Sequence, residues 1–346
     1  MKISTAQKPR AFAIVIVLVS VTVLALLAGA FAYAMKVETR LMANTNNDEQ
    51  FYWIGRGGID RACWFLAQEG NQPFTSLQQY WNHGPGDGPE TNSPLVGESL
   101  DNYQIGIGTV SVTMTELESK INLNTADAPL LQQVLTQMGV DASAISVVSD
   151  SILDWIGPGD AARPAGAKSD YYQGVGGYNS KNGPIDDIQE LQLIKGVTPE
   201  MFKGTPPEDA AALPQHHLGF GNAPSQLPTY AFGLRDVFTP FSTGKINVLT
   251  ADEKVLNLIP GMDTATVENI LKLRGDTEPP LRSLAQLAGA GANPQAMQQI
   301  SRYLDVRGDT YEVHATATIG GLSHEYTAVV FRRGANVQVV SFCRTK

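Results

Sequence analysis

Cysteine is nearly absent from this sequence, since only Cys63 and Cys343 occur among 346 residues. Two thiols so far apart in the chain lack the spacing of a metal site. The common signatures of hydrolases and of phosphate-binding loops are missing too: there is no G-x-S-x-G, no H-E-x-x-H and no glycine-rich loop directly after a strand. We therefore predict that the chain is not an enzyme.

Charge is also sparse, and it is mostly of one sign. Charged residues make up 17% of the chain, the net charge is −9, and the acidic side chains are scattered rather than gathered in runs. An acidic body repels nucleic-acid phosphates and anionic membrane surfaces. The composition therefore argues against a nucleic-acid partner, whereas it permits divalent cations.

Only one long apolar run occurs, close to the N-terminus. Residues 11–35 form a stretch of 25 residues without a charge, which as a helix would span roughly 37 Å, enough to cross a hydrocarbon core of about 30 Å. The charges before it are Lys2, Lys8 and Arg10, so the positive-inside rule keeps the short N-terminal segment in the cytoplasm. We predict one membrane span, residues 12–35, and a body exported across the membrane.

The residues of this segment leave three interpretations open. Ala32-Tyr33-Ala34 is a small-x-small pattern typical of signal-peptide cleavage, which would start the mature chain at Met35. The apolar core is, however, longer than that of an ordinary signal peptide. The second interpretation is a plain single-span anchor, and the third is a leader cut on the cytoplasmic side of the membrane.

The junction from Lys8 to Leu18 resembles the leader of type IV prepilins. A short basic segment ends in a small residue, Ala11, and the apolar helix opens directly with Phe12. The resemblance implies cleavage by a prepilin peptidase between these two residues. Ala11 stands where glycine is usual, and Ile16, fifth in the mature chain, stands where most pilins carry glutamate. In that family the missing glutamate is a mark of the K-type minor pseudopilins of type II secretion.

The helical pattern continues beyond the anchor. Apolar residues recur at steps of three and four as far as Leu66, with charged residues between them, which predicts a single helix of some fifty residues. Residues 44–47 and the glycine-rich residues 55–58 are positions where we expect it to bend or fray. Strand patterns follow at residues 103–115, 311–319, 322–332 and 335–343. They form one antiparallel sheet only if the first pairs with strands beyond residue 310.

The chain between these strands is then an insertion with a helical pattern and an internal repeat. The segment KINLNTAD at 120–127 matches KINVLTAD at 245–252 at six of eight positions, and each copy opens a helix with Thr125 or Thr250 as the expected N-cap. The second copy resembles a helix-hairpin-helix module with its hairpin at residues 260–263. Asp263 occupies the place of a glycine that approaches DNA phosphate in DNA-binding members, and a carboxylate repels phosphate. This predicts a structural use of the module.

The features together resemble the K-type minor pseudopilins (general secretion pathway protein K). These features are the leader, the missing glutamate, the two Lys-Ile-Asn starts, the split sheet, and a turn-rich loop carrying Asp-Trp, Pro-Gly-Asp, Tyr-Tyr and Asn-Gly-Pro. The resemblance implies an α+β, type IV pilin-like fold, with a long N-terminal helix packed on an antiparallel sheet and a large inserted all-α domain of two helix-hairpin-helix or SAM-like units. The expected boundaries are a leader at 1–11, the membrane part of the helix at 12–35, pilin-like segments at 36–119 and 309–346, and the insertion at 120–308.

Two kinds of site residue follow. Oxygen ligands on turns suit calcium, and the resemblance implies calcium as a candidate ligand, with no cofactor required; five aspartates bracket the loop, namely Asp154, Asp160, Asp170, Asp186 and Asp187. Outside the cytoplasm the even number of cysteines permits a disulfide between Cys63 and Cys343. Alternatively, both thiols pack as small apolar side chains.

The predicted function is that of a minor pseudopilin at the tip of the type II secretion pseudopilus. The resemblance implies an inner-membrane protein of a diderm bacterium with its body in the periplasm, whose partners are other minor pseudopilins and the prepilin peptidase, and which supports export of folded proteins. Two alternatives remain, a secreted enzyme behind a signal peptide and a membrane-anchored helix-hairpin-helix protein that binds DNA during uptake. The second would need a basic face built from Lys195, Lys203, Lys245, Lys272 and Arg274.

Overall fold

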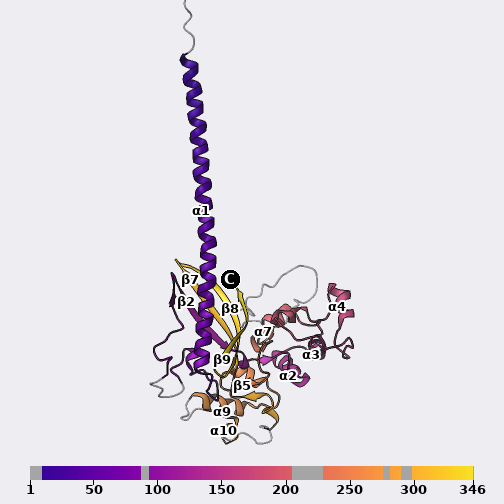
Figure 1. Cartoon of the computed structure of the whole chain (residues 1–346). Coiled ribbons are helices and arrows are strands. Elements are labelled where there is room, and N and C mark those ends of the chain that lie inside the picture. The colour runs from indigo at the N-terminus through magenta and orange to yellow at the C-terminus, as the bar shows by residue number, and fades with distance from the viewer. Residues whose placement is uncertain (1–9, 87–92, 205–228, 276–280, 290–297, 346) are drawn as a thin grey trace, which may run out of the picture.

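A computed structural model describes residues 10–86, 93–204, 229–275, 281–289 and 298–345, with the side chains of residues 10–13 and 39–47 left out of the description. Its most prominent element is α1, a helix of 59 residues from Arg10 to Gln68. The first half of α1 projects from the body, and the second half packs against a sheet (Figure 1). Residues 1–9 of the predicted leader lie outside the described residues.

The projecting half of α1 carries the predicted membrane span. Ile14–Glu38 has a mean hydropathy of 2.9, none of its most apolar window is buried inside the protein, and it is the one span candidate among the described residues. In water, the apolar side chains of a helix with no protein around it would be exposed, and this exposure is unfavourable in free energy. The segment therefore has the length and composition of a single-pass anchor.

The packed half of α1 buries one face, as the periodicity predicts. Phe51, Ile54, Ile59, Ala62 and Leu66 are all less than 5% exposed, and they face the sheet in the core of the head. Recurrence at three and four residues places them on one side of a helix. The free energy of this burial holds the helix to the head.

Helix α1 is continuous through residues 44–47 and 55–58, where a bend was expected. At residues 55–58 the contacts of the glycines with the sheet explain why. A Cβ on Gly55 would meet the ring of Tyr326 at 2.3 Å, and one on Gly58 would meet Val110 at 2.6 Å. These glycines are sites of close approach between helix and sheet. The packing against the sheet outweighs the poor helix propensity of glycine, about 1 kcal/mol per residue relative to alanine.

The sheet is antiparallel and joins distant parts of the chain. Its strand order is β1-β2-β7-β8-β9, where β1 is Tyr103–Ile105, β2 Gly108–Glu116, β7 Thr310–Ile319, β8 Leu322–Arg333 and β9 Asn336–Arg344. The pairing of β2 with β7, from Thr109 opposite Thr318 to Glu116 opposite Tyr311, confirms that the first strand pairs with strands beyond residue 310. A turn at Gly106 and Ile107 divides the predicted strand at residues 103–115 into β1 and β2.

The chain between β2 and β7 forms a second body with its own hydrophobic core. Its longer helices are α2 (Ala128–Met138), α3 (Ala142–Ile156), α4 (Ser169–Gly176) and α9 (Thr264–Gly275). Its shorter ones are α5 (Pro199–Lys203), α7 (Leu234–Val237), α8 (Glu253–Asn257) and α10 (Leu284–Gly289). Single turns of 3-10 helix lie at Leu117–Ser119 and Ile188–Leu193, and another, in the head, at Tyr80–Asn82.

This body is not purely helical. β3 (Ile121–Asn122) pairs in parallel with β4 (Phe238–Thr239), and β5 (Ile246–Asn247) pairs in parallel with β6 (Leu304–Asp305). Each pair begins at one of the two repeats, because the Ile-Asn of the repeat forms the first strand. The N-cap positions of the following helices are Asp127 and Asp252, rather than Thr125 and Thr250, and of the two only Asp127 accepts a capping hydrogen bond through its side chain, from the backbone nitrogen of Leu130.

Candidate functional site

An exposed stripe on α1 is the first candidate surface. Trp53 is 64% exposed and Trp64 36% exposed, and eleven residues make almost three full turns, so both indoles lie on one side of the helix. Gly57 and Asp60 fall between them on the same side, and Asp60 pairs with Arg56 at 3.2 Å. We call Trp53, Gly57, Asp60 and Trp64 the indole stripe. The two exposed indoles form an apolar surface suited to another helix, whereas Gly57 is half-buried against Ile105.

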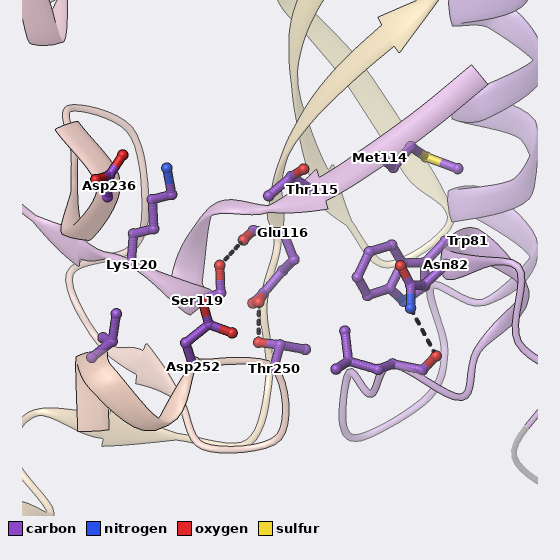
Figure 2. A pocket seen from close by; sticks show the side chains of 12 residues that line it. Trp81, Asn82, Met114, Thr115, Glu116, Ser119, Lys120, Asp236, Thr250 and Asp252 are labelled. Atoms are coloured by element: carbon purple, nitrogen blue, oxygen red, sulfur yellow. Dashed lines mark hydrogen bonds between the residues drawn. The ribbon is translucent and has the colours of Figure 1, made fainter. Parts of the chain in front are cut away.

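The joint between head and insertion is the second candidate, and it holds buried carboxyl groups (Figure 2). Glu116, the last residue of β2, is 1% exposed. Its carboxyl group accepts a hydrogen bond from the hydroxyl of Thr250 and another from Asn247 Nδ2 at 3.3 Å. Burial raises the pKa of Glu116 well above its ordinary value, and the nearby Glu118 raises it further. The end of a head strand is thereby tied to the second repeat.

Glu118 and Arg332 complete this joint. Glu118 accepts bonds from the backbone nitrogens of Thr243 (3.0 Å) and Thr310 (3.0 Å), so it connects the insertion to the start of β7. Burial raises the pKa of Glu118 as well, against the effect of these donors. Arg332 on β8 donates from Nη2 to Thr75 Oγ1 at 2.8 Å and to the carbonyl of Gly308 at 2.7 Å.

A cleft of about 250 Å³ lies beside the joint. It is lined by Trp81, Asn82 and Met114 on the head and by Lys120, Asp236 and Asp252 on the insertion (Figure 2). The titratable groups of its lining are Glu116, Lys120, Asp236 and Asp252, with no histidine or cysteine among them. The residues here fit a structural joint.

Three of the five aspartates predicted as calcium ligands are already engaged by other groups. Asp154 is fully buried and accepts two bonds from Arg163, one from its backbone nitrogen at 2.9 Å and one from Nη1 at 2.7 Å. Asp186 forms an ion pair with Lys181 at 2.7 Å. Asp187 caps the turn that starts at Ile188, by accepting a bond from the backbone nitrogen of Gln189.

The two remaining aspartates do not join them. Asp160 is exposed and receives a weak bond of 3.4 Å from Asn182 Nδ2, while Asp170 lies in the first turn of α4. No three histidine, cysteine, aspartate or glutamate side chains gather to hold a metal ion anywhere in the described ranges. Calcium takes six to eight oxygen ligands, so these aspartates do not fit the site that the resemblance implies.

Both cysteines are free, so the disulfide that the even count permits is not formed. Cys63 lies on α1, partly buried against the core of the head, and Cys343 is exposed on the edge strand β9. Burial, with the negative charge of Asp60, raises the pKa of the Cys63 thiol to about 11. Cys63 therefore packs as a small apolar side chain, which was the alternative to the disulfide.

Two of the five basic residues that DNA binding would need are used inside the fold. Arg274 donates to the backbone carbonyls of Val248 and Ala251, and burial lowers its pKa to about 10. Lys195 donates to the carbonyls of Ala165 and Gly166 at 3.3 and 3.1 Å. Asp263 accepts a bond from the backbone nitrogen of Thr266 at 2.6 Å, and so caps α9 rather than facing a ligand.

The predicted processing residues lie at the start of α1. Ala11 and Phe12 fall in its first turn, and their side chains are outside the description. Ile16 is 52% exposed within the bare half of the helix. An apolar residue at this depth in a membrane needs no polar partner, in contrast to a carboxylate.

Comparison with known families supports the resemblance seen in the sequence. Residues 113–208, which run from β2 to just beyond α5, match the family described as "Type II secretion system (T2SS), protein K". No curated protein matches the sequence.

The fold has a counterpart among solved structures. A chain of the GspK-GspI-GspJ complex from the type 2 secretion system of enterotoxigenic Escherichia coli is similar over 88% of this chain and 99% of its own, with a TM-score of 0.64 and 15% sequence identity. The shared architecture is an N-terminal helix with an antiparallel sheet, interrupted by helical structure. At this identity the likeness concerns the fold.

Proposed function

We propose that this chain, whose residues 113–208 place it in the protein K family of the type II secretion system, is the minor pseudopilin that caps the tip of the pseudopilus. Its family is a structural component of the secretion machinery. Capping the tip would start assembly and thereby support export of folded proteins. The buried hydrogen bonds of Glu116 and Glu118 at the joint support a structural role.

The observation that carries this proposal is the position of the insertion. It lies beside the head and beyond the end of α1 that is far from the membrane span (Figure 1). In a helical assembly built by stacking heads along parallel α1 helices, that space belongs to the next subunit. A chain with this bulk fits where nothing stacks above it, which is the tip.

Other minor pseudopilins are the proposed partners. The solved complex joins GspK to GspI and GspJ, and the indole stripe offers them a helical surface on this chain. The edge strand β9 lies near the same helix and also presents apolar side chains, with Val340 58% exposed. The large exposed side chains of Trp53 and Trp64 favour packing of a second helix on this surface.

The bare half of α1 supports an inner-membrane location with the body in the periplasm. We further propose that a prepilin peptidase cuts between Ala11 and Phe12, and that the new N-terminus is methylated. Cleavage there would leave Ile14–Glu38, the span candidate, intact in the mature protein. No nucleic acid is proposed as a partner, because Arg274 and Lys195 are engaged within the fold.

N-terminal sequencing and the intact mass of the protein from membranes that contain the peptidase test this route. We expect the mature chain to begin at Phe12 with an added methyl group. A chain that begins at Met35 would show signal-peptide cleavage and would contradict the pseudopilin assignment. Membranes without the peptidase serve as the control, in which the leader should be retained.

A further inference from the structure

The acidic loop of the insertion encloses an ammonium group. Lys168, just before α4, is 6% exposed. Its Nζ donates to the carbonyl oxygens of Asp154 (2.5 Å) and Gly157 (2.7 Å) and to Asn182 Oδ1 (2.8 Å). Asn182 has a left-handed backbone with a φ of 51°, which is uncommon for a residue other than glycine. The unfavourable backbone conformation of Asn182 thus directs its Oδ1 toward the ammonium group of Lys168.

The donors and acceptors of this cage match in number. A lysine ammonium group has three N–H donors and no acceptor, and the cage supplies three oxygens at hydrogen-bond distance. A calcium ion would need six to eight oxygens at 2.3–2.6 Å, and the nearby carboxylate of Asp154 is already taken by Arg163. The cage is therefore complete with the lysine and has no room for a metal ion in the same place.

A second ammonium group, that of Lys181, pairs with two further acids of the loop. Lys181 Nζ lies 2.7 Å from both Asp186 Oδ2 and Glu190 Oε1. The other oxygen of Glu190 accepts a bond from the indole of Trp155 at 3.2 Å, and Trp155 belongs to the core of the insertion. The loop is thereby fastened to that core through a lysine. A metal ion bridging two carboxylates would do the same.

We propose that Lys168 and Lys181 take the place of bound calcium in this chain, so that the acidic loop folds and remains folded without a divalent cation. The resemblance implies calcium for this region, and the structure assigns the position of the cation to the side chains of the protein itself. The loop would then be independent of the calcium concentration in the periplasm. This inference does not rest on the proposed position at the tip.

The test uses the full chain purified in detergent, with thermal unfolding as the readout. We expect the Tm of the wild-type protein to change by less than about 1 °C between excess EGTA and millimolar Ca²⁺, because only a ligand that binds the folded state raises the Tm, by an amount that grows with RT ln(1 + L/Kd), where L is the free ligand concentration. A Tm that falls by several degrees in EGTA would overturn the proposal. So would terbium luminescence sensitised by Trp155 and displaced by micromolar Ca²⁺.

Variants test the lysines themselves. Lys168→Ala leaves three inward-facing oxygens without a donor, and we expect its Tm to fall by about 5 °C or more in EGTA, with a smaller fall for the half-buried Lys181→Ala. Lys203→Ala, at an exposed position in the last turn of α5, is the matched control. If Lys168→Ala unfolds no earlier than the control, the lysine does not hold the loop and the proposal is wrong. Should Lys168→Ala not fold at all, the wild-type measurement in EGTA still decides.

Discussion

Glu116 ties the head to the insertion through a carboxyl group that is shut off from water. Its partners, Thr250 and Asn247, are a hydroxyl and an amide, so a neutral side chain can be satisfied there. Burial raises the pKa of Glu116 above the value of 4.5 that an exposed glutamate would have. The folded state therefore favours the protonated form, and the stability contribution of Glu116 is present below pH 4.5 and is lost as the pH rises through the folded pKa.

The variant Glu116→Gln should remove this pH dependence. Glutamine keeps the shape and stays neutral, so we expect its Tm to equal that of the wild type near pH 4.5 and to exceed it increasingly at higher pH. Thermal unfolding from pH 4 to pH 9 measures the difference. A constant difference across this range would show that Glu116 titrates normally in the folded protein.

Glu312 on β7 provides a control of opposite sign. The hydrogen bond with His314 lowers the pKa of Glu312, so its contribution to stability is present above the unfolded pKa and lost as the pH falls through the folded pKa. Glu312→Gln should therefore be less stable than the wild type at neutral pH, and the difference should vanish in acid. Because this pair is partly exposed, the effect will be small.

At the scale of elements, the contact between α1 and the sheet depends on a glycine. A Cβ on Gly58 would lie 2.6 Å from Val110 and 3.2 Å from Ala315, in a fully packed region. Overpacking costs about 1–3 kcal/mol, and alanine regains about 1 kcal/mol of helix propensity. We expect Gly58→Ala to lower the free energy of unfolding by about 1–2 kcal/mol, as measured by urea denaturation.

Gly57→Ala is the matched control on the next residue. Its Cβ would meet only the terminal Cδ1 of Ile105 at 2.7 Å, and the end of a flexible side chain can move aside. We therefore expect Gly57→Ala to be neutral or slightly stabilising. Equal losses in the two variants would contradict the claim that the side chains packed around Gly58 cannot move aside.

The elements also show how far the sequence could predict the structure. Period-3.6 and period-2 patterns predicted α1 and the strands of the split sheet, because burial of one face imposes both periods. The glycines at 55–58 were expected to weaken the helix, since a sequence shows their low propensity but not the sheet packed against them. The helix caps fell two residues after Thr125 and Thr250, because Asn122 and Asn247 form turns of their own first, accepting bonds from the nitrogens of Asn124 and Leu249.

The candidate sites were less predictable than the elements. Acidic residues on turns are compatible with a metal, with N-caps or with ion pairs, and only the folded chain shows that Lys168 and Lys181 reach them. Whether Cys63 and Cys343 form a disulfide likewise depends on which faces of α1 and β9 carry them, and the sequence alone does not show this. The indole stripe could have been found from the spacing of Trp53 and Trp64, which lie eleven residues apart on a predicted helix.

The whole molecule joins an anchor, a head with an antiparallel sheet and a bulky insertion. We propose that the insertion leaves no space for another subunit above the head, so that this chain occupies the tip of an assembly. This proposal depends on where the insertion lies relative to α1 (Figure 1). We also propose that the indole stripe attaches this subunit to the helix of the next one.

Immunogold labelling of pseudopili with an antibody against the insertion tests this claim most directly. The account predicts a single label at one end of each filament, lost in Trp53→Ala and kept in Tyr171→Ala, which removes an aromatic side chain 41% exposed on the insertion. The antibody would be raised against a segment away from Tyr171. Labels spaced along the length of the filaments would contradict the tip position, and an end label that survives Trp53→Ala would contradict the role of the stripe.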